Sequence, residues 1–191
     1  MLSQLRRIVQ DVAQEPVLNN ALAGLVSNVK NALKTECCSV YLADYDQQHF
    51  MLMATDGLNP EAVGQISIGF SEGLIGWVGQ REEPINLAQA HLHPRFKVTP
   101  EVSEDRFSAF LGCPIIHHRK VLGVLTIQQG ESRVFSEDEE SFLVTLGVQL
   151  ASVLVNAEMR QLTSQSPSQH VHVGQLQGLI GAPGIAIGEG F

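Results

Sequence analysis

The 191-residue sequence contains few cysteines and few cationic residues, and both shortages limit what the protein can do. Its three cysteines, two of which are adjacent, are too few for a disulfide framework, so the reducing cytoplasm is the expected location. Twelve lysines and arginines stand against twenty aspartates and glutamates, which gives a net charge of −8. Because this charge repels phosphate backbones and anionic lipids, neither nucleic acid nor a membrane surface is an expected partner.

The sequence also lacks a long apolar run. Its most apolar stretch, residues 142–155, has 14 residues and is interrupted by polar side chains, whereas a bilayer span needs about 20. Gln10 and Asp11 lie where a signal peptide would have its apolar region. We therefore expect neither a transmembrane helix nor an export signal.

Motifs for phosphate and metal chemistry are missing as well. The glycine-rich stretch 69–79 is not followed by the Lys-Ser/Thr pair of a P-loop, so close helix packing is the favoured interpretation. No histidine has a metal-binding motif around it, and we predict no metal and no cofactor for this chain. Cys37 and Cys38 are neighbours on a predicted strand, without a basic partner, which favours structural thiols.

Hydrophobic periodicity predicts helices at both ends of the chain and strands between them. Apolar residues at helical spacing predict helices over 2–13, 17–34 and 136–162, and Ser71 is expected to cap a short helix that runs to Arg81. Period-two patterns predict strands over 37–42, 49–55, 107–117 and 121–129, with 65–68 as a further candidate. Ser136 and Glu139 have the spacing of a capping box.

This order of elements predicts an α+β sandwich. We expect a central antiparallel sheet of about five or six strands, with the N- and C-terminal helices on one face. The short helix and a long polar loop, residues 88–106, would cover the other face. A ligand cavity between sheet and loop follows from this arrangement.

The long loop supplies the first candidate binding residues. It concentrates cationic groups in an otherwise acidic chain, and arginine can bind a carboxylate through two parallel hydrogen bonds. Arg95 and Arg106 are therefore the candidate clamps, and replacing either by alanine is expected to weaken binding of a small amino or keto acid. The alternative is a solvated loop whose cations pair with its own acidic residues, Glu101, Glu104 and Asp105.

Strand alternation and the short helix supply four further candidates. Ser39 and Tyr41 point to the opposite face from Val40, so this polar pair faces the cavity if the apolar set packs on the helices. Trp77 would form a wall of the cavity. Asn86 offers both the donor and the acceptor that an amide-bearing ligand needs.

Several of these segments together resemble a GAF domain. The motifs are Glu72-Gly73-Leu74-Ile75-Gly76-Trp77-Val78, Pro84-Ile85-Asn86-Leu87, His93-Pro94-Arg95-Phe96, Phe110-Leu111-Gly112-Cys113-Pro114-Ile115 and Val121-Leu122-Gly123-Val124-Leu125-Thr126-Ile127-Gln128. With the helix start Phe135-Ser136-Glu137-Asp138-Glu139, the resemblance covers about residues 1 to 160. It implies a GAF-like sandwich that senses a small molecule.

The C-terminal residues resemble a second family. Residues 179–188, Leu-Ile-Gly-Ala-Pro-Gly-Ile-Ala-Ile-Gly, are similar to the opening of the phosphoenolpyruvate-utilising region of phosphotransferase-system enzyme I. A GAF domain followed by that opening resembles the nitrogen-related enzyme I, a phosphoenolpyruvate-protein phosphotransferase. The resemblance implies an N-terminal fragment with a GAF sensor domain over 1–163, a linker over 164–177 and the truncated start of the enzyme I region over 178–191.

This second resemblance also implies a function. Nitrogen-related enzyme I phosphorylates its own histidine with phosphoenolpyruvate and passes the phosphate to a small carrier protein, and its parent enzyme is expected to use Mg²⁺. The GAF domain of that family is associated with nitrogen signals, glutamine and 2-oxoglutarate. We therefore expect a regulatory domain that binds such an effector, forms a homodimer and has no catalytic activity of its own. The alternative is a structural homodimerisation module with a vestigial pocket.

Other functions of GAF domains find no support in the residues. Free methionine sulfoxide reductases use cysteines in the helix-start and lid regions, where this chain has Ile75 and no cysteine between residues 39 and 112. The Cys-His pair of bilin attachment and the motif of cyclic-nucleotide binding are also missing.

Overall fold

The computed structural model describes residues 1–165. Most of the predicted linker and the predicted enzyme I opening, from residue 166 on, lie outside the described residues. Residues Met1–Asn156 form one compact unit, and the described residues 157–165 belong to a second unit. The cavity and the elements around it belong to the first unit.

Helices at both ends flank a set of strands, as the periodicity predicts. The helices are α1 (Leu2–Gln14), α2 (Leu18–Leu33), α3 (Gly73–Arg81) and α4 (Glu137–Gln165). The strands are β1 (Cys37–Asp44), β2 (His49–Asp56), β3 (Ser67–Gly69), β4 (Ile85–Leu87), β5 (Ala109–His117) and β6 (Lys120–Gln129). Short 3-10 helices are η1 (Pro60–Ala62), η2 (Ala90–Leu92), η3 (Pro100–Val102) and η4 (Glu104–Arg106), the last three within the long loop.

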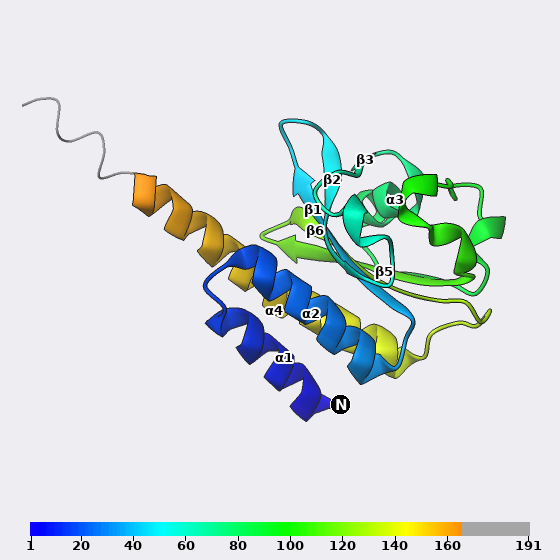
Figure 1. The fold of residues 1–191 in the computed structure, drawn as a ribbon, viewed down its shortest axis with the longest axis horizontal. Helices are drawn as coiled ribbons and strands as arrows, with labels where there is room; N and C mark the ends of the chain where they lie inside the picture. The colour runs from blue at the N-terminus through cyan, green and yellow to red at the C-terminus, as the bar shows by residue number, and fades with distance from the viewer. Residues whose placement is uncertain (166–191) are drawn as a thin grey trace, which may run out of the picture. The chain divides into compact units, whose positions relative to one another are not determined.

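The six strands form one antiparallel sheet in the order β3-β2-β1-β6-β5-β4 (Figure 1). Strand β1 lies inside the sheet, so its alternate residues serve different layers. Cys38 and Val40 pack into the core with the long helices, whereas Cys37 and Tyr41 pack into the core on the α3 side. This division confirms the predicted alternation of β1 and the opposite directions of the two adjacent thiols.

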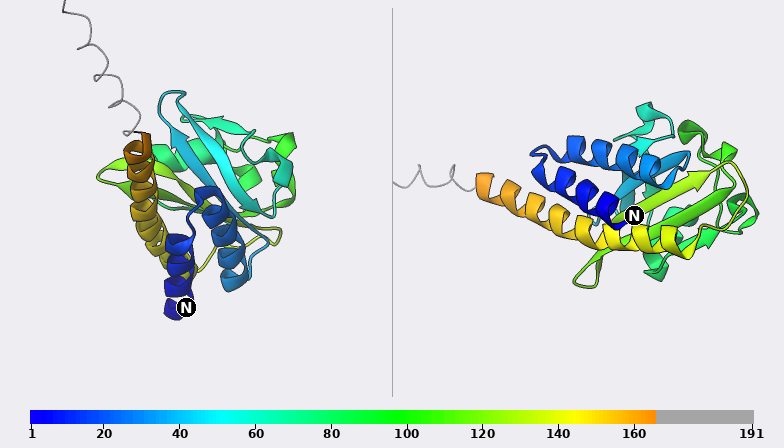
Figure 2. Two further views of the ribbon diagram at one scale, coloured as in Figure 1. Left: turned by 60° about the vertical axis from the view of Figure 1, so that its left-hand side comes forward. Right: turned by 90° about the horizontal axis from the view of Figure 1, so that it is seen from below.

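The predicted α+β sandwich is confirmed. Helices α1, α2 and the first part of α4 lie together on one side of the sheet, and α3 with the long loop lies on the other (Figure 2). The apolar stripe of α4 packs in the core through Phe142, Leu143, Leu146 and Leu150. By length and composition alone, Glu137–Thr163 could cross a membrane, with a mean hydropathy of 1.5, but a buried core helix passes the same test.

The start of α4 contains the predicted capping box. The Ser136 amide donates to the Glu139 carboxylate (2.7 Å), and the Glu139 amide donates to the Ser136 hydroxyl (3.2 Å). The Arg133 guanidinium pairs with the same carboxylate (2.8 Å) and holds the pKa of Glu139 below its ordinary value. Side-chain groups at Ser136 and Glu139 thus satisfy backbone donors that the helix cannot pair internally.

Helix α3 begins later than predicted. Its N-cap is Glu72, and the expected cap, Ser71, instead accepts a hydrogen bond from the side chain of Gln80 (3.1 Å). The glycines of α3 permit close packing, as predicted. A Cβ on Gly76 would lie 2.9 Å from backbone oxygens of the preceding turn, and one on Gly79 would lie 2.7 Å from the ring of Phe50.

Candidate functional site

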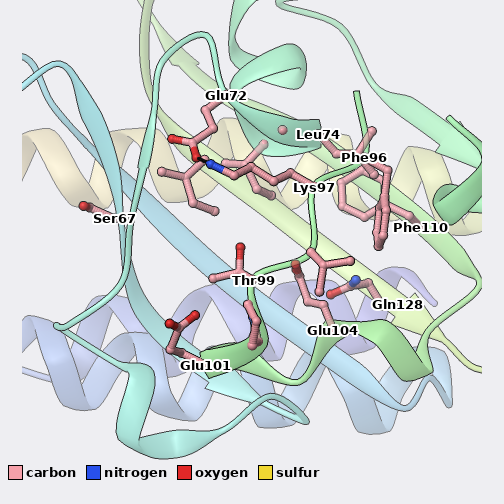
Figure 3. A pocket seen from close by; sticks show the side chains of 15 residues that line it. Ser67, Glu72, Leu74, Phe96, Lys97, Thr99, Glu101, Glu104, Phe110 and Gln128 are labelled. Atoms are coloured by element: carbon pink, nitrogen blue, oxygen red, sulfur yellow. Dashed lines mark hydrogen bonds and ion pairs between the residues drawn. The ribbon is translucent and has the colours of Figure 1, made fainter. Parts of the chain in front are cut away.

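A cavity of about 260 Å³ lies between the sheet, the start of α3 and the long loop, where the layer arrangement predicts one (Figure 3). At about 30 Å³ per water, this volume holds roughly eight or nine waters or one metabolite the size of an amino acid. The lining comes from β3 and the start of α3 (Ser67, Ile68, Glu72, Gly73, Leu74, Ile75), from the loop (Phe96, Lys97, Val98, Thr99, Pro100, Glu101, Glu104) and from the sheet (Phe110, Gln128).

The charge of this lining differs from the expected cationic clamp. Three carboxylates, those of Glu72, Glu101 and Glu104, line the cavity, against the single ammonium group of Lys97. Lys97 forms an ion pair with Glu72, and this pair holds the pKa of Glu72 below its ordinary value. The cavity is therefore net negative when all of its side chains are ionised.

Glu104 is the carboxylate that points into the protein. The residue is half-buried as a whole because its backbone lies on the surface loop, while its carboxyl end reaches the sheet. In Figure 3 the side chains of Glu104 and Gln128 point toward one another. Gln128 is only 4% exposed, and the hydroxyl of the buried Tyr41 lies on the same side of the sheet.

Burial raises the pKa of Glu104 to about 7, even though Gln128 and Tyr41 each lower it. Desolvation is the dominant cause, because a charged carboxylate loses more hydration than a neutral acid when it leaves water. No positively charged group is among the causes of this shift. Burial and the nearby Glu104 carboxyl, which faces the Tyr41 hydroxyl, also raise the pKa of Tyr41.

The two candidate arginines lie on the loop but not in the cavity lining. Arg106 donates to the backbone carbonyl of Gly57, and its guanidinium lies 4.7 Å from the centre of the Phe107 ring. Arg95 reaches the carbonyl of Ser71 (3.4 Å) and the side chain of Gln80 (3.3 Å). Both side chains therefore fasten the loop to neighbouring segments, and their role as ligand clamps stays a prediction.

Ser39, Tyr41 and Trp77 lie on the cavity side of the sheet but do not line the cavity itself. Ser39 is fully buried and shares a hydrogen bond with the Thr55 hydroxyl (2.8 Å). Tyr41 lies beneath Glu104, in the layer behind the lining. Trp77 stacks on His93, with ring centres 4.3 Å apart, and so braces the loop against α3.

Asn86 lies on the opposite face of the sheet from the cavity. Its amide nitrogen donates to the carbonyl of Phe135 (2.9 Å), and its amide oxygen accepts from the backbone amide of the same residue (3.0 Å). Asn86 thus ties β4 to the segment that leads into α4. The sequence does not reveal this role, because β4 has three residues and its alternation cannot be read.

The buried thiols have no sign of activation. Burial raises the pKa of Cys37 to about 11 and that of Cys113 to about 12, and it also raises the pKa of Cys38. A thiolate nucleophile requires the opposite shift. Within residues 1–165, no group of three His, Cys, Asp or Glu side chains is placed to hold a metal ion.

Sequence reasoning did not select the residues that give the cavity its chemistry. The sequence could have revealed Gln128 and Thr126, since both are polar residues within the apolar strand β6. It could not have revealed Glu104, because Glu104 is one of several acidic residues in a loop without periodicity. Its inward direction is set by η4 and becomes visible only in three dimensions.

The chain matches the family model of the GAF domain over residues 18–154. Together with the six-stranded sheet and the cavity beneath α3 and the loop, this match shows that the chain belongs to the GAF domain family.

Similarity to individual proteins shows which kind of GAF domain this chain is. Over its full 191 residues the chain is 48% identical to proteins of Escherichia coli (strain K12) and Salmonella typhimurium (strain LT2), each named "Phosphoenolpyruvate-dependent phosphotransferase system". The chain spans 25% of the length of these curated relatives. The GAF domain of a phosphoenolpyruvate-protein phosphotransferase from Coxiella burnetii is 46% identical, with a TM-score of 0.80 over 84% of this chain and 96% of that one.

A corresponding domain from Acinetobacter is 45% identical, with a TM-score of 0.76 and the same coverage of both chains. The chain is thus a GAF domain of the kind found in phosphoenolpyruvate-protein phosphotransferases. A free methionine-R-sulfoxide reductase from Neisseria meningitidis, solved in complex with its substrate, has a TM-score of 0.70 over 82% of this chain and 89% of that one. It is 19% identical and shares the fold alone.

Replacing Asn86 by alanine is expected to destabilise the domain by about 1–3 kcal/mol, because two hydrogen bonds to Phe135 are lost together. Urea denaturation measures this loss. The exposed Asn19 of α2, replaced in the same way, should change stability by less than about 0.5 kcal/mol. An Asn86→Ala variant of unchanged stability would show that the contact to Phe135 is unimportant.

Replacing Glu104 by glutamine is expected to change how stability depends on pH. Since the pKa of Glu104 is raised in the folded protein, the folded state binds its proton more tightly, and stability is lost as pH rises from about 4.5 through about 7. Above pH 7 the variant should be more stable than the wild type by about 2 to 3 kcal/mol, with little difference near pH 4.5. Parallel pH profiles of the two proteins in urea denaturation would contradict this account.

Proposed function

We propose that this domain is a regulatory, small-molecule-sensing module of a phosphoenolpyruvate-protein phosphotransferase. It controls autophosphorylation and phosphate transfer to a carrier protein in response to nitrogen metabolites, with glutamine and 2-oxoglutarate as candidate effectors. The observation that carries the proposal is the cavity of about 260 Å³ with a polar floor beneath α3 and the loop. A cavity of this size between a sheet and a loop suits one small metabolite.

The polar floor supports occupation by a ligand. Gln128 lines the cavity and is 4% exposed, and behind it the buried hydroxyl of Thr126 has no hydrogen-bond partner among the described residues. A buried polar group without a partner costs about 1–3 kcal/mol. Such a cost calls for an explanation, and a polar ligand in the adjacent cavity is the one that we propose.

The side chains of the lining favour binding over catalysis. They offer carboxylates, one ammonium group, hydroxyls and an amide, and the nearest thiol, Cys37, has a raised pKa. Chemistry on phosphoenolpyruvate, a need for Mg²⁺ and the contact with a phosphocarrier protein would belong to parts of such a phosphotransferase outside the GAF domain. The whole protein would act in the cytoplasm.

A second candidate function is homodimerisation, with or without a ligand in the cavity. Val144 and Val148 are exposed one turn apart on α4, with Val148 59% exposed. Apolar residues at this spacing form a stripe that a second copy of the chain can cover through a two-fold contact. Light scattering at tens of micromolar protein separates a dimer from a monomer.

Equilibrium dialysis against L-glutamine and 2-oxoglutarate tests the sensing function, and at least one of the two should bind. Replacing Thr99, which lines the cavity, by tryptophan should fill the space and abolish that binding. The control is Thr145→Trp on the exposed surface of α4, which should leave the affinity unchanged. If neither compound binds and light scattering gives a dimer, the dimerisation module is the better account.

A further inference from the structure

The cavity has two chemically different ends. At one end, the Glu104 carboxyl lies against the sheet beside Gln128 and Tyr41. At the other end, Glu72 and Lys97 form their ion pair at the start of α3. Figure 3 shows the two pairs apart, with Thr99 between them. A ligand that spans the cavity therefore contacts the Glu104 carboxyl at one end and the Glu72–Lys97 ion pair at the other.

The Glu104 end requires a cation or a strong hydrogen-bond donor. Burial disfavours the charge of this carboxylate, while Lys97 is paired with Glu72 and Arg106 donates to the carbonyl of Gly57. The neighbours of this carboxylate, the hydroxyl of the buried Tyr41 and the amide of Gln128, are both uncharged groups. An ammonium group placed here would gain a charged partner and would be held by oxygen acceptors on its other sides.

The other end suits a carboxylate. Leu74 and Ile75 lie in the first turn of α3 and line the cavity, and within residues 1–165 no side chain caps this helix end with a hydrogen bond. Backbone N–H groups at a helix N-terminus attract anions. Lys97 adds a positive charge, which a ligand carboxylate would share with Glu72.

The structure assigns a ligand class to this cavity, on the basis of the sensing function proposed above. We propose that it binds a free α-amino acid as a zwitterion, with the ammonium group on the Glu104 carboxylate and the carboxylate at Lys97 and the first turn of α3. Glu104 is thus the residue that determines specificity. A 2-oxo acid has no ammonium group to offer Glu104 and adds negative charge to a lining that is already net negative.

Binding of this kind is coupled to protons. Near pH 7 about half of the Glu104 side chains carry a proton, and an ammonium ligand selects the ionised half. Binding should therefore release about half a proton per ligand at pH 7, whereas a dianion at the same place would cause proton uptake. The charged and titratable groups around Glu104 are Cys37 and Tyr41 on β1, Glu72 ahead of α3, and Lys97, Glu101 and Arg106 on the loop.

Isothermal titration calorimetry on the full 191-residue chain tests the proposal. A thermal-shift screen of the twenty amino acids and their 2-oxo acids first selects the amino acid that binds best. That amino acid and its analogue without the ammonium group are then titrated at pH 7 in phosphate and in Tris, whose different ionisation enthalpies reveal proton transfer. The proteins are the wild type, Glu104→Gln and the matched control Asp105→Asn, which changes an exposed carboxylate of the same loop outside the lining.

The amino acid should bind the wild type about 10- to 150-fold more tightly than its analogue, and Glu104→Gln should lose a similar factor together with the proton release. Asp105→Asn should stay within about threefold of the wild type, because an exposed charge outside the lining contributes little. If 2-oxo acids bind as tightly as amino acids, or if Glu104→Gln binds like the wild type, the proposal is overturned while the sensing function stands. If no compound of either class binds, both are overturned.

Discussion

The two-sided sheet is the constraint on which the rest of the structure depends. Strands β1 and β6 are covered on both faces, so every second residue must suit the helical layer and every other residue the layer under α3. On the helical side, the buried residues of these two strands are apolar. On the other side Gln128 and Tyr41 are buried polar residues, and a cavity remains between them and the loop. The cavity floor is thus part of the same strands that hold the core together.

The position of Glu104 connects stability with the proposed function. A carboxylate held against the sheet without a cation lowers the stability of the folded domain at neutral pH. Proteins keep such costs mainly where they serve binding or catalysis, since a neutral glutamine would fit the same space. The arginines of the loop contribute differently, because Arg106 ties the loop to Gly57 and thereby holds η4 and Glu104 in place.

Periodicity in the sequence was sufficient to predict the helices, the long strands, the layer arrangement and the capping box of α4, because each depends on local spacing. It did not predict the contents of the site. Asn86 lies on a three-residue strand whose face cannot be read, and its amide binds the backbone of Phe135. The partners of Arg95 and Arg106 depend on how an aperiodic loop folds over α3 and β2, so charge alone could not identify them.

If the buried Glu104 carboxylate recognises the ammonium group of an amino acid, the pKa of this carboxyl must fall when the amino acid binds. An NMR titration of the Glu104 side-chain carboxyl carbon, with and without saturating amino acid, measures this pKa. We expect a midpoint near pH 7 in the free domain, which falls by at least about one pH unit when the ammonium group stabilises the charged form. A midpoint near the ordinary glutamate value of about 4.3, unmoved by the amino acid, would contradict it.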